Sequence, residues 1–319
     1  IKEKYMSKLK PGPVYSIVTP FQKDLSIDFE KLEEYIKYAY DAGAEQFYVM
    51  GYNSRFSELS WDEIKNLNKF VTKTIKDLNS NNFIIVADPL HCPSKVSLEF
   101  TQEAEDYGAD MISLIFREKF YSNEQVLAHF KYITDNSSTP ILIHEMPFIS
   151  GLGGHTVNWP VELLNQLADF DNIQAIKEDA KEDEYSKEVI TKIRDRLSIV
   201  ISGGGKRQWM QFAEEGCQNW LNGIGVFEPK LAVNFWNAWE NRDRQFCDKL
   251  VNDVEVPFFT NLVKKYGWHL SIRAALEIEG HFPRTERLPM LPINDDQFAS
   301  FKSEFEKIDY KKYLEYNPN

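Results

Sequence analysis

Lys177 is the residue whose position points most directly to chemistry. It ends a short apolar run that begins at Ile173, and the acidic pair Glu178-Asp179 follows it. Because strand side chains alternate between two faces, Ile173, Ala175 and Lys177 are expected to share one face. A lysine that ends an inward-facing apolar row is partly desolvated, which lowers its pKa and leaves an amine able to attack a carbonyl. The alternative is that Lys177 begins an acidic loop in which its charge is solvated.

The composition is that of an ordinary soluble globular protein. The chain has 319 residues, of which 43% are apolar and 27% charged, with a net charge of −12 that argues against a nucleic-acid surface. Apolar runs such as Phe83–Ala87 are too short to span a bilayer, and Ile1–Lys10 shows no secretory signal. The widely spaced Cys92, Cys217 and Cys247 fit neither a zinc pattern nor a disulfide framework. We therefore expect a cytoplasmic protein without membrane association, bound metal or cofactor.

Strand-like and helix-like segments alternate along the chain, as in the βα units of a parallel sheet. The predicted strands are Val14–Val18, Gln46–Met50, Phe83–Ala87, Met111–Ile115, Ile141–His144, Ile173–Lys177, Ser198–Ser202 and Trp220–Ile224. Strand–helix units that fill about 225 residues have the size and order of a (β/α)8 TIM barrel. A doubly wound open sheet is the alternative, but no Gly-x-Gly-x-x-Gly motif follows the first strand.

Capping signals mark where several helices begin. Asp28 can cap one helix, and Ser60 with Glu63 and Ser122 with Gln125 have the spacing of capping boxes. Helical stretches without intervening strands follow, at Leu231–Trp239, Phe246–Lys265, Ser271–Glu279 and Asp295–Lys307. We expect an N-terminal extension over residues 1–11, the barrel over residues 12–228, and a C-terminal helical extension packed on the barrel over residues 229–319.

Chemistry in a TIM barrel sits at the C-terminal ends of the strands. Polar or glycine residues follow the predicted strands there: Thr19, Tyr52 to Arg55, Asp88 and His91, Arg117 to Lys119, His144-Glu145, Lys177 to Asp179, Ser202 to Gly205, and Asn222-Gly223. Any one of them is expected of a loop, but their convergence on one face favours an active site.

The chain resembles the dihydrodipicolinate synthase / N-acetylneuraminate lyase family of class I aldolases and dehydratases. The resemblance covers about residues 12–307 and rests on Thr19-Pro20-Phe21, Gly51 to Ser60, Gly108-Ala109-Asp110, His129-Phe130, Ile176-Lys177-Glu178, Ser202-Gly203, Pro229 and Arg287-Leu288-Pro289. It implies a (β/α)8 barrel with Lys177 as the Schiff-base lysine, a small 2-keto acid substrate and a homo-oligomer, either a dimer or a tetramer built of dimers.

Several positions depart from the family pattern. Tyr52 and Asn53 replace its paired threonines, and His144 replaces the tyrosine that relays protons to the imine. The arginine that holds a substrate carboxylate in the synthases falls at about Ile149. Arg117-Glu118 stands where the synthases have a Tyr-Tyr pair, one member of which crosses a subunit interface. The resemblance therefore implies a sugar-derived 2-keto acid substrate in place of the synthase reaction.

A class I mechanism needs an amine, a proton shuttle and donors for a substrate carboxylate. Lys177 supplies the amine, and His144 can supply the shuttle because an imidazole titrates near neutrality. Alternatively, His144 is a structural hydrogen-bonding group. The candidate substrate-binding residues are Tyr52, Asn53, Ser54, Gly203, Gly204 and Asn222. Arg55 and Arg117 are either anion-binding groups or members of surface ion pairs.

Two other functions remain open. The first is a metal-dependent lyase or isomerase that uses a carboxylate cluster; its ligands would be Asp88, Glu118, His144, Glu145 and Asp179. The second is a catalytically retired barrel that keeps Lys177 and binds a small carboxylate or sugar without turning it over.

Overall fold

The computed structural model describes residues 9–116, 122–146, 148–149, 156–202 and 205–318. Eight parallel strands close a barrel in the order β1-β10-β9-β8-β5-β4-β3-β2. They are β1 (Gly12–Ser16), β2 (Gln46–Tyr48), β3 (Phe83–Ala87), β4 (Met111–Leu114), β5 (Ile141–Glu145), β8 (Ile173–Glu178), β9 (Ser198–Ile201) and β10 (Asn219–Leu221). The predicted fold is confirmed, and each predicted strand overlaps an observed one.

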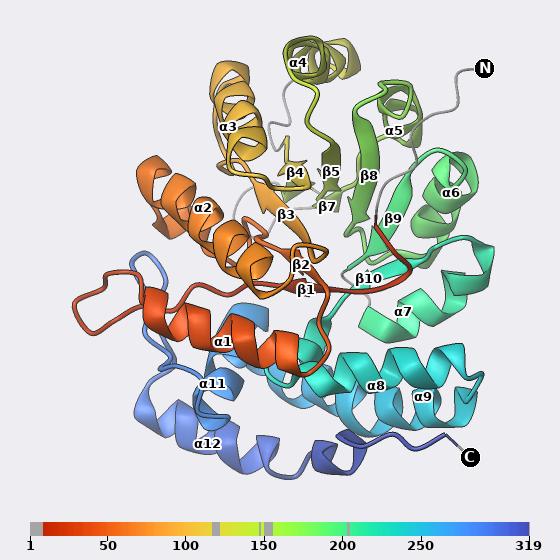
Figure 1. Cartoon of the computed structure of the whole chain (residues 1–319). Helices are drawn as coiled ribbons and strands as arrows, with labels where there is room; N and C mark the ends of the chain where they lie inside the picture. The colour runs from red at the N-terminus through yellow and green to blue at the C-terminus, as the bar shows by residue number, and fades with distance from the viewer. Residues whose placement is uncertain (1–8, 117–121, 147, 150–155, 203–204, 319) are drawn as a thin grey trace.

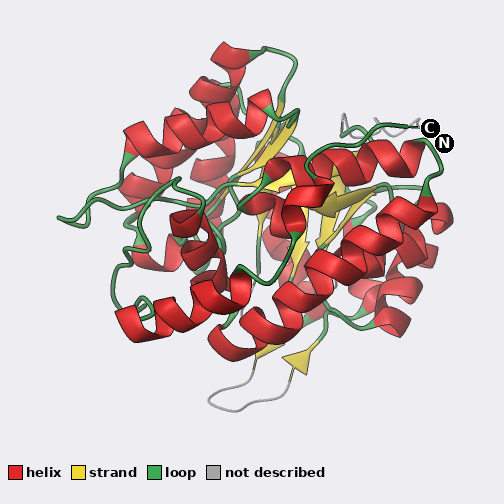
Figure 2. Cartoon of the chain, turned by 90° about the horizontal axis from the view of Figure 1, so that it is seen from below, coloured by secondary structure: helices red, strands yellow, loops and turns green. Residues whose placement is uncertain are grey.

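Helices surround the barrel (Figures 1 and 2). They are α1 (Phe29–Asp41), α2 (Trp61–Leu78), α3 (Ser94–Asp106), α4 (Asn123–Asn136), α5 (Val161–Leu167), α6 (Asp183–Ile193), α7 (Gly205–Phe212) and α8 (Pro229–Glu240). The Asp28 cap of α1 and the capping boxes of α2 and α4 form as predicted. Short 3₁₀ turns add Phe56–Glu58, Ala213–Glu215, Gly223–Val226 and Tyr310–Tyr313.

The C-terminal region is helical, as expected. A continuous helix runs from α9 (Arg244–Leu250) through two π-helical segments, Val251–Glu255 and Phe258–Val263, to α10 (Lys264–Tyr266). It is followed by α11 (Trp268–Ile278) and α12 (Asp295–Phe305). Figure 1 shows α8, α9, α11 and α12 gathered on the side of the barrel next to α1. The predicted division at residue 228 falls between β10 and α8, the helix that completes the strand–helix alternation.

The strands of the barrel separate two hydrophobic clusters. One fills the barrel interior with inward-facing strand residues such as Val14, Tyr48, Ile85 and Leu142, and the other lies between the strands and the helices. In the described part of the chain, no helix is long and apolar enough to cross a membrane.

One element was not predicted. The strands β6 (Phe148–Ile149) and β7 (Thr156–Val157) pair antiparallel after β5. Each has only two residues, too few for an alternating pattern to be read from sequence. The backbone of Ile149, at the position of the family's carboxylate-binding arginine, belongs to this pair.

Candidate active site

Lys177 lies near the end of β8, with its side chain fully buried. Ala175 belongs to the cluster inside the barrel, as expected, but Ile173 packs in the outer cluster. The predicted shared face of Ile173 and Ala175 is wrong because the pairing with β5 skips Gln174, so the alternation shifts there. Burial lowers the pKa of Lys177, as the sequence predicted, since a charged ammonium loses its hydration inside the barrel.

His144 lies beside Lys177 on the neighbouring strand. The two residues are register partners in the β5–β8 pairing, and the distance from Lys177 Nζ to His144 Nε2 is 3.0 Å. His144 is 2% exposed. The sequence-based expectation that this imidazole reaches the lysine amine is met, with direct hydrogen-bond contact.

Asp179 completes the group, and sequence reasoning did not assign it this position. Lys177 Nζ donates to Asp179 Oδ2 over 2.9 Å, and His144 Nε2 lies 3.5 Å from the same oxygen. Burial by itself raises the pKa of Asp179, but the opposite charge of Lys177 and the contact with His144 bring the pKa well below its usual value. The available signal was spacing, because a residue two positions after Lys177 returns to the same face of an extended chain.

Two buried carboxyl groups lie behind this group, on the outer face of the same strands. Glu145 pairs in register with Glu178, and Glu145 Oε1 accepts a hydrogen bond from the Trp159 backbone amide over 3.3 Å. Burial and the repulsion from Glu178 raise the pKa of Glu145 to about 8. Burial likewise raises the pKa of Glu178 to about 7. At least one of the two therefore holds a proton near neutral pH.

The residues after β2 are engaged with other parts of the barrel mouth. The Tyr52 ring lies 5.1 Å, centre to centre, from the His269 ring on α11. Asn53 donates to Ser16 Oγ over 3.0 Å and accepts from Trp268 Nε1 over 3.1 Å. The hydroxyl of Ser54 donates to a backbone carbonyl of the loop after β1, so it already joins two loops.

Asn222 lies directly after β10 and is fully buried. Its Oδ1 accepts from the Ser16 backbone amide over 3.1 Å. Its Nδ2 is buried and has no hydrogen-bond partner among the described residues, so a role of Asn222 in substrate binding stays a prediction. Gly203 and Gly204, the other predicted binding residues, lie outside the described residues.

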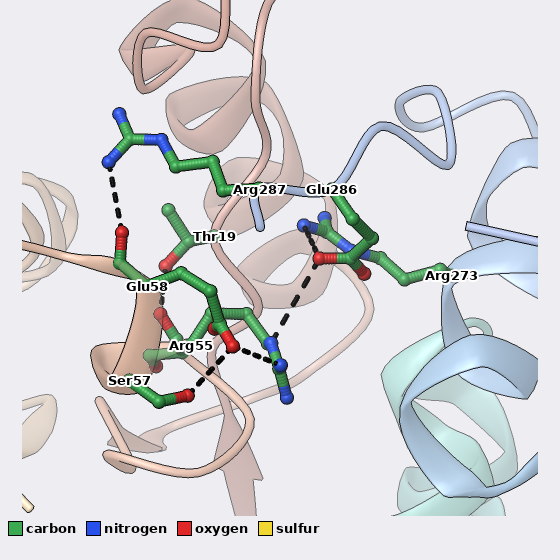
Figure 3. Close-up of polar contacts among 8 residues, drawn as sticks. Thr19, Arg55, Ser57, Glu58, Arg273, Glu286 and Arg287 are labelled. Atoms are coloured by element: carbon green, nitrogen blue, oxygen red, sulfur yellow. Dashed lines mark hydrogen bonds and ion pairs between the residues drawn. The ribbon is translucent and has the colours of Figure 1, made fainter. Parts of the chain in front are cut away.

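Arg55 forms buried ion pairs and does not project to the surface (Figure 3). Its Nη2 lies 2.6 Å from Glu58 Oε1, and its Nε lies 3.9 Å from Glu286 Oε2. Glu286 also pairs with Arg273 of α11 over 2.7 Å, and Arg287 Nη1 donates to the Glu58 carbonyl over 3.2 Å. This network joins the loop after β2 to the C-terminal helices. Arg117, the other candidate for anion binding, lies outside the described residues.

Of the five residues proposed for a metal cluster, the four that the structure describes do not form one metal-binding group. Asp179 contacts His144, whereas Glu145 faces Trp159 and Asp88 accepts a hydrogen bond from Ser97 over 2.7 Å. Glu118 lies outside the described residues. Within the described ranges, no group of three or more His, Cys, Asp and Glu side chains is arranged to hold a metal ion.

Comparisons with known proteins agree with this fold. A chain from Chlorobaculum parvum named 4-hydroxy-tetrahydrodipicolinate synthase is 23% identical over 306 residues, which cover 95% of this chain and 98% of that one. An uncharacterized DapA-like lyase from Pyrococcus furiosus is 25% identical over 247 residues, covering 76% of this chain and 78% of that one. The crystal structure of YagE, a prophage protein of E. coli K12 in complex with pyruvate, superposes with a TM-score of 0.83 at 19% identity, covering 95% of this chain and 99% of that one. The model of the dihydrodipicolinate synthetase family matches residues 11–308, and the chain belongs to this family.

Proposed function

We propose that this protein is a Schiff-base-forming lyase that acts on a 2-keto acid, with Lys177 as the nucleophile. The observation that carries the proposal is the contact of the buried Lys177 amine with both His144 and Asp179. The proposal also rests on membership of a family of class I aldolase-type lyases. Such an enzyme needs an amine that can become neutral before it attacks and a neighbouring group that exchanges protons with it.

The arrangement supports a sequence of proton transfers. His144 Nε2 accepts the proton of the Lys177 ammonium, which leaves a neutral amine and an imidazolium that the Asp179 carboxylate stabilises. The amine attacks the keto carbon, and the imidazolium returns the proton to the carbonyl oxygen. His144 then moves a proton from the new C–N nitrogen to the hydroxyl group, which leaves as water and gives the protonated imine. The imine then acts as the electron acceptor when the substrate is cleaved or dehydrated.

The substrate that we infer is sugar-derived. The aspartate-semialdehyde reaction of the synthases uses a carboxylate-binding arginine and a tyrosine–threonine relay, and this chain has Ile149, His144 and Tyr52-Asn53 at those positions. Loss of a proton relay costs about 10²-fold to 10⁴-fold in rate. We therefore expect no useful condensation of pyruvate with aspartate semialdehyde. Membership of the family also supports a homo-oligomer. The three free cysteines support a reducing cytoplasm.

A turnover assay tests the proposal. The purified protein is incubated with a panel of sugar-derived 2-keto acids, and release of pyruvate or formation of a dehydrated keto acid is followed. We expect turnover of at least one panel member, loss of turnover in Lys177→Arg, and a fall in kcat of about 10²-fold to 10⁴-fold in His144→Phe without loss of the fold. Full activity of Lys177→Arg, or faster synthase turnover than lyase turnover, would refute it.

A further inference from the structure

The short loop after β8 determines whether the Asp179 carboxylate reaches the Lys177 amine. Residues 179–182 form this loop and join β8 to α6. Asp179 is the first of them, and its Oδ2 lies 2.9 Å from Lys177 Nζ. Lys181, two positions later, has a φ of +64°, a left-handed backbone conformation that is uncommon for residues other than glycine. A loop of this kind keeps its shape only where surrounding contacts hold it.

The side chain of Glu178 supplies one such contact. Glu178 is the last residue of β8 and is 1% exposed. Its Oε1 accepts a hydrogen bond from the Ala180 backbone amide over 2.6 Å, so this bond spans Asp179. The strand end is fixed as well, because the Ser202 backbone amide donates to the Glu178 carbonyl over 3.0 Å. The backbone on both sides of Asp179 is therefore anchored through Glu178.

Two helices hold the other carboxyl oxygen of Glu178. The hydroxyl of Ser186 on α6 donates to Glu178 Oε2. The side-chain amide of Gln208 on α7 donates in turn to Ser186 Oγ over 3.2 Å. All three side chains are buried, and hydrogen bonds are stronger in such surroundings than in water. The carboxyl group of Glu178 therefore has a fixed position relative to α6 and α7.

We propose that Glu178 is a positioning residue that holds Asp179 against the Lys177 amine. Without an acceptor for the Ala180 amide, the loop would lose its anchor and the Asp179 carboxylate its contact with Lys177. This role rests on the proposed function, because Lys177 is the nucleophile there. The contact between Asp179 and Lys177 can nevertheless be measured without any imine.

The titration of the Lys177 amine tests the proposal in the absence of substrate. The protein is labelled with ¹³C at the lysine ε-carbons, and the Lys177 resonance, identified by its loss in Lys177→Arg, is followed against pH by NMR. Asp179→Asn removes the charge that stabilises the ammonium and should lower the titration midpoint by about 1 pH unit or more. Glu178→Met, which keeps a long side chain without an oxygen, should lower the midpoint to a similar extent. The double variant should titrate like Asp179→Asn, because both substitutions remove the same contact.

Glu178→Gln separates positioning from charge. Glutamine keeps an oxygen that accepts from the Ala180 amide but has no negative charge, so the midpoint should stay close to that of the wild type. Movement of Lys181 with the loop cannot imitate the expected result. The charge of Lys181 lowers the pKa of Lys177, so its displacement would raise the midpoint.

Three results would overturn the proposal. The first is an unchanged midpoint in Asp179→Asn or in a folded Glu178→Met. The second is a midpoint in Glu178→Gln as low as that in Glu178→Met, which would assign the effect to charge. If Glu178→Met does not fold, Ser186→Ala takes its place, since it removes the hydroxyl that anchors Glu178 and should also lower the midpoint. The third is an unchanged midpoint in that variant. Failure of the lyase assignment would instead give the expected midpoints with no imine at Lys177.

Discussion

At Lys177 two opposing effects act on one amine. Burial lowers its pKa, and the nearby charge of Asp179 raises it. The net direction is downward, so desolvation outweighs the ion pair, as a buried nucleophilic lysine requires. Lys177 and His144 could be predicted from residue type and strand position. Asp179 was predicted only as part of an acidic loop or as a ligand of the alternative metal cluster, because its contact with both residues depends on how far the strand extends beyond Lys177.

Replacing Asp179 with asparagine tests this balance. Asp179→Asn removes the charge that stabilises the ammonium, so the pKa of Lys177 should fall further. Imine formation with pyruvate, followed as borohydride-trapped protein against pH, should then reach its half-maximum at lower pH than in the wild type. Asp183→Asn, a substitution at the start of α6, is the matched control and should leave the profile unchanged. A shift of the Asp179→Asn profile to higher pH would contradict the assigned role.

At the scale of elements, sequence spacing over a few residues was enough to predict where helices begin. Contacts between residues far apart in the chain could not be predicted in this way. The caps at Asp28, Ser60 and Ser122 involve residues three positions apart, so sequence spacing alone predicted them. The pairing between β5 and β8 skips Gln174, and this irregularity depends on the neighbouring strand. The sequence around Gln174 alone does not predict it. The Arg55–Glu286 contact joins residues far apart in the chain, and only the folded structure shows that Arg55 is buried and paired.

Glu286 should matter more to stability than an exposed acid. Glu286→Ala leaves Arg55 and Arg273 buried beside it with reduced compensation, which should lower the free energy of unfolding by about 3–5 kcal/mol. Asp135→Ala, which breaks an exposed pair with Lys131, is the control and should cost less than about 1 kcal/mol. Urea unfolding of the two variants makes the comparison. Equal losses would show that the network does not hold the C-terminal helices to the barrel.

At the scale of the whole molecule, the sequence determines the net charge of −12. Only the structure shows which carboxyl groups have a raised pKa. Glu145, Glu178 and Asp88 are buried, and burial raises their pKa values to about 8, 7 and 7. Between about pH 5 and these values, the folded state keeps protons that the unfolded chain has released. Their contribution to stability is therefore present at low pH and is lost as the pH rises through the folded-state pKa values.

Glu145→Gln tests how much the Glu145 carboxyl contributes to the pH dependence of stability. Glutamine imitates the protonated carboxyl and does not titrate, so the stability of the variant relative to the wild type should increase with pH. We expect the difference in the free energy of unfolding to grow by more than about 1 kcal/mol between pH 6 and pH 9. Glu162→Gln, at a side chain that is 61% exposed, should show no such growth. A pH-independent difference for Glu145→Gln would indicate that this carboxyl ionises normally in the folded protein.

The central claim, a carbonyl-reactive amine at Lys177, is tested most directly by locating a trapped imine. The protein is treated with sodium borohydride in the presence of pyruvate and of sugar-derived 2-keto acids, digested, and mapped by peptide mass spectrometry. We predict one modified residue, Lys177, carrying the mass of the keto acid less one oxygen atom, and no equivalent adduct in Lys177→Arg. The buried Lys206, which pairs with Glu255, serves as an internal reference that should stay unmodified. An adduct on another lysine, or no adduct across the panel, would contradict the account.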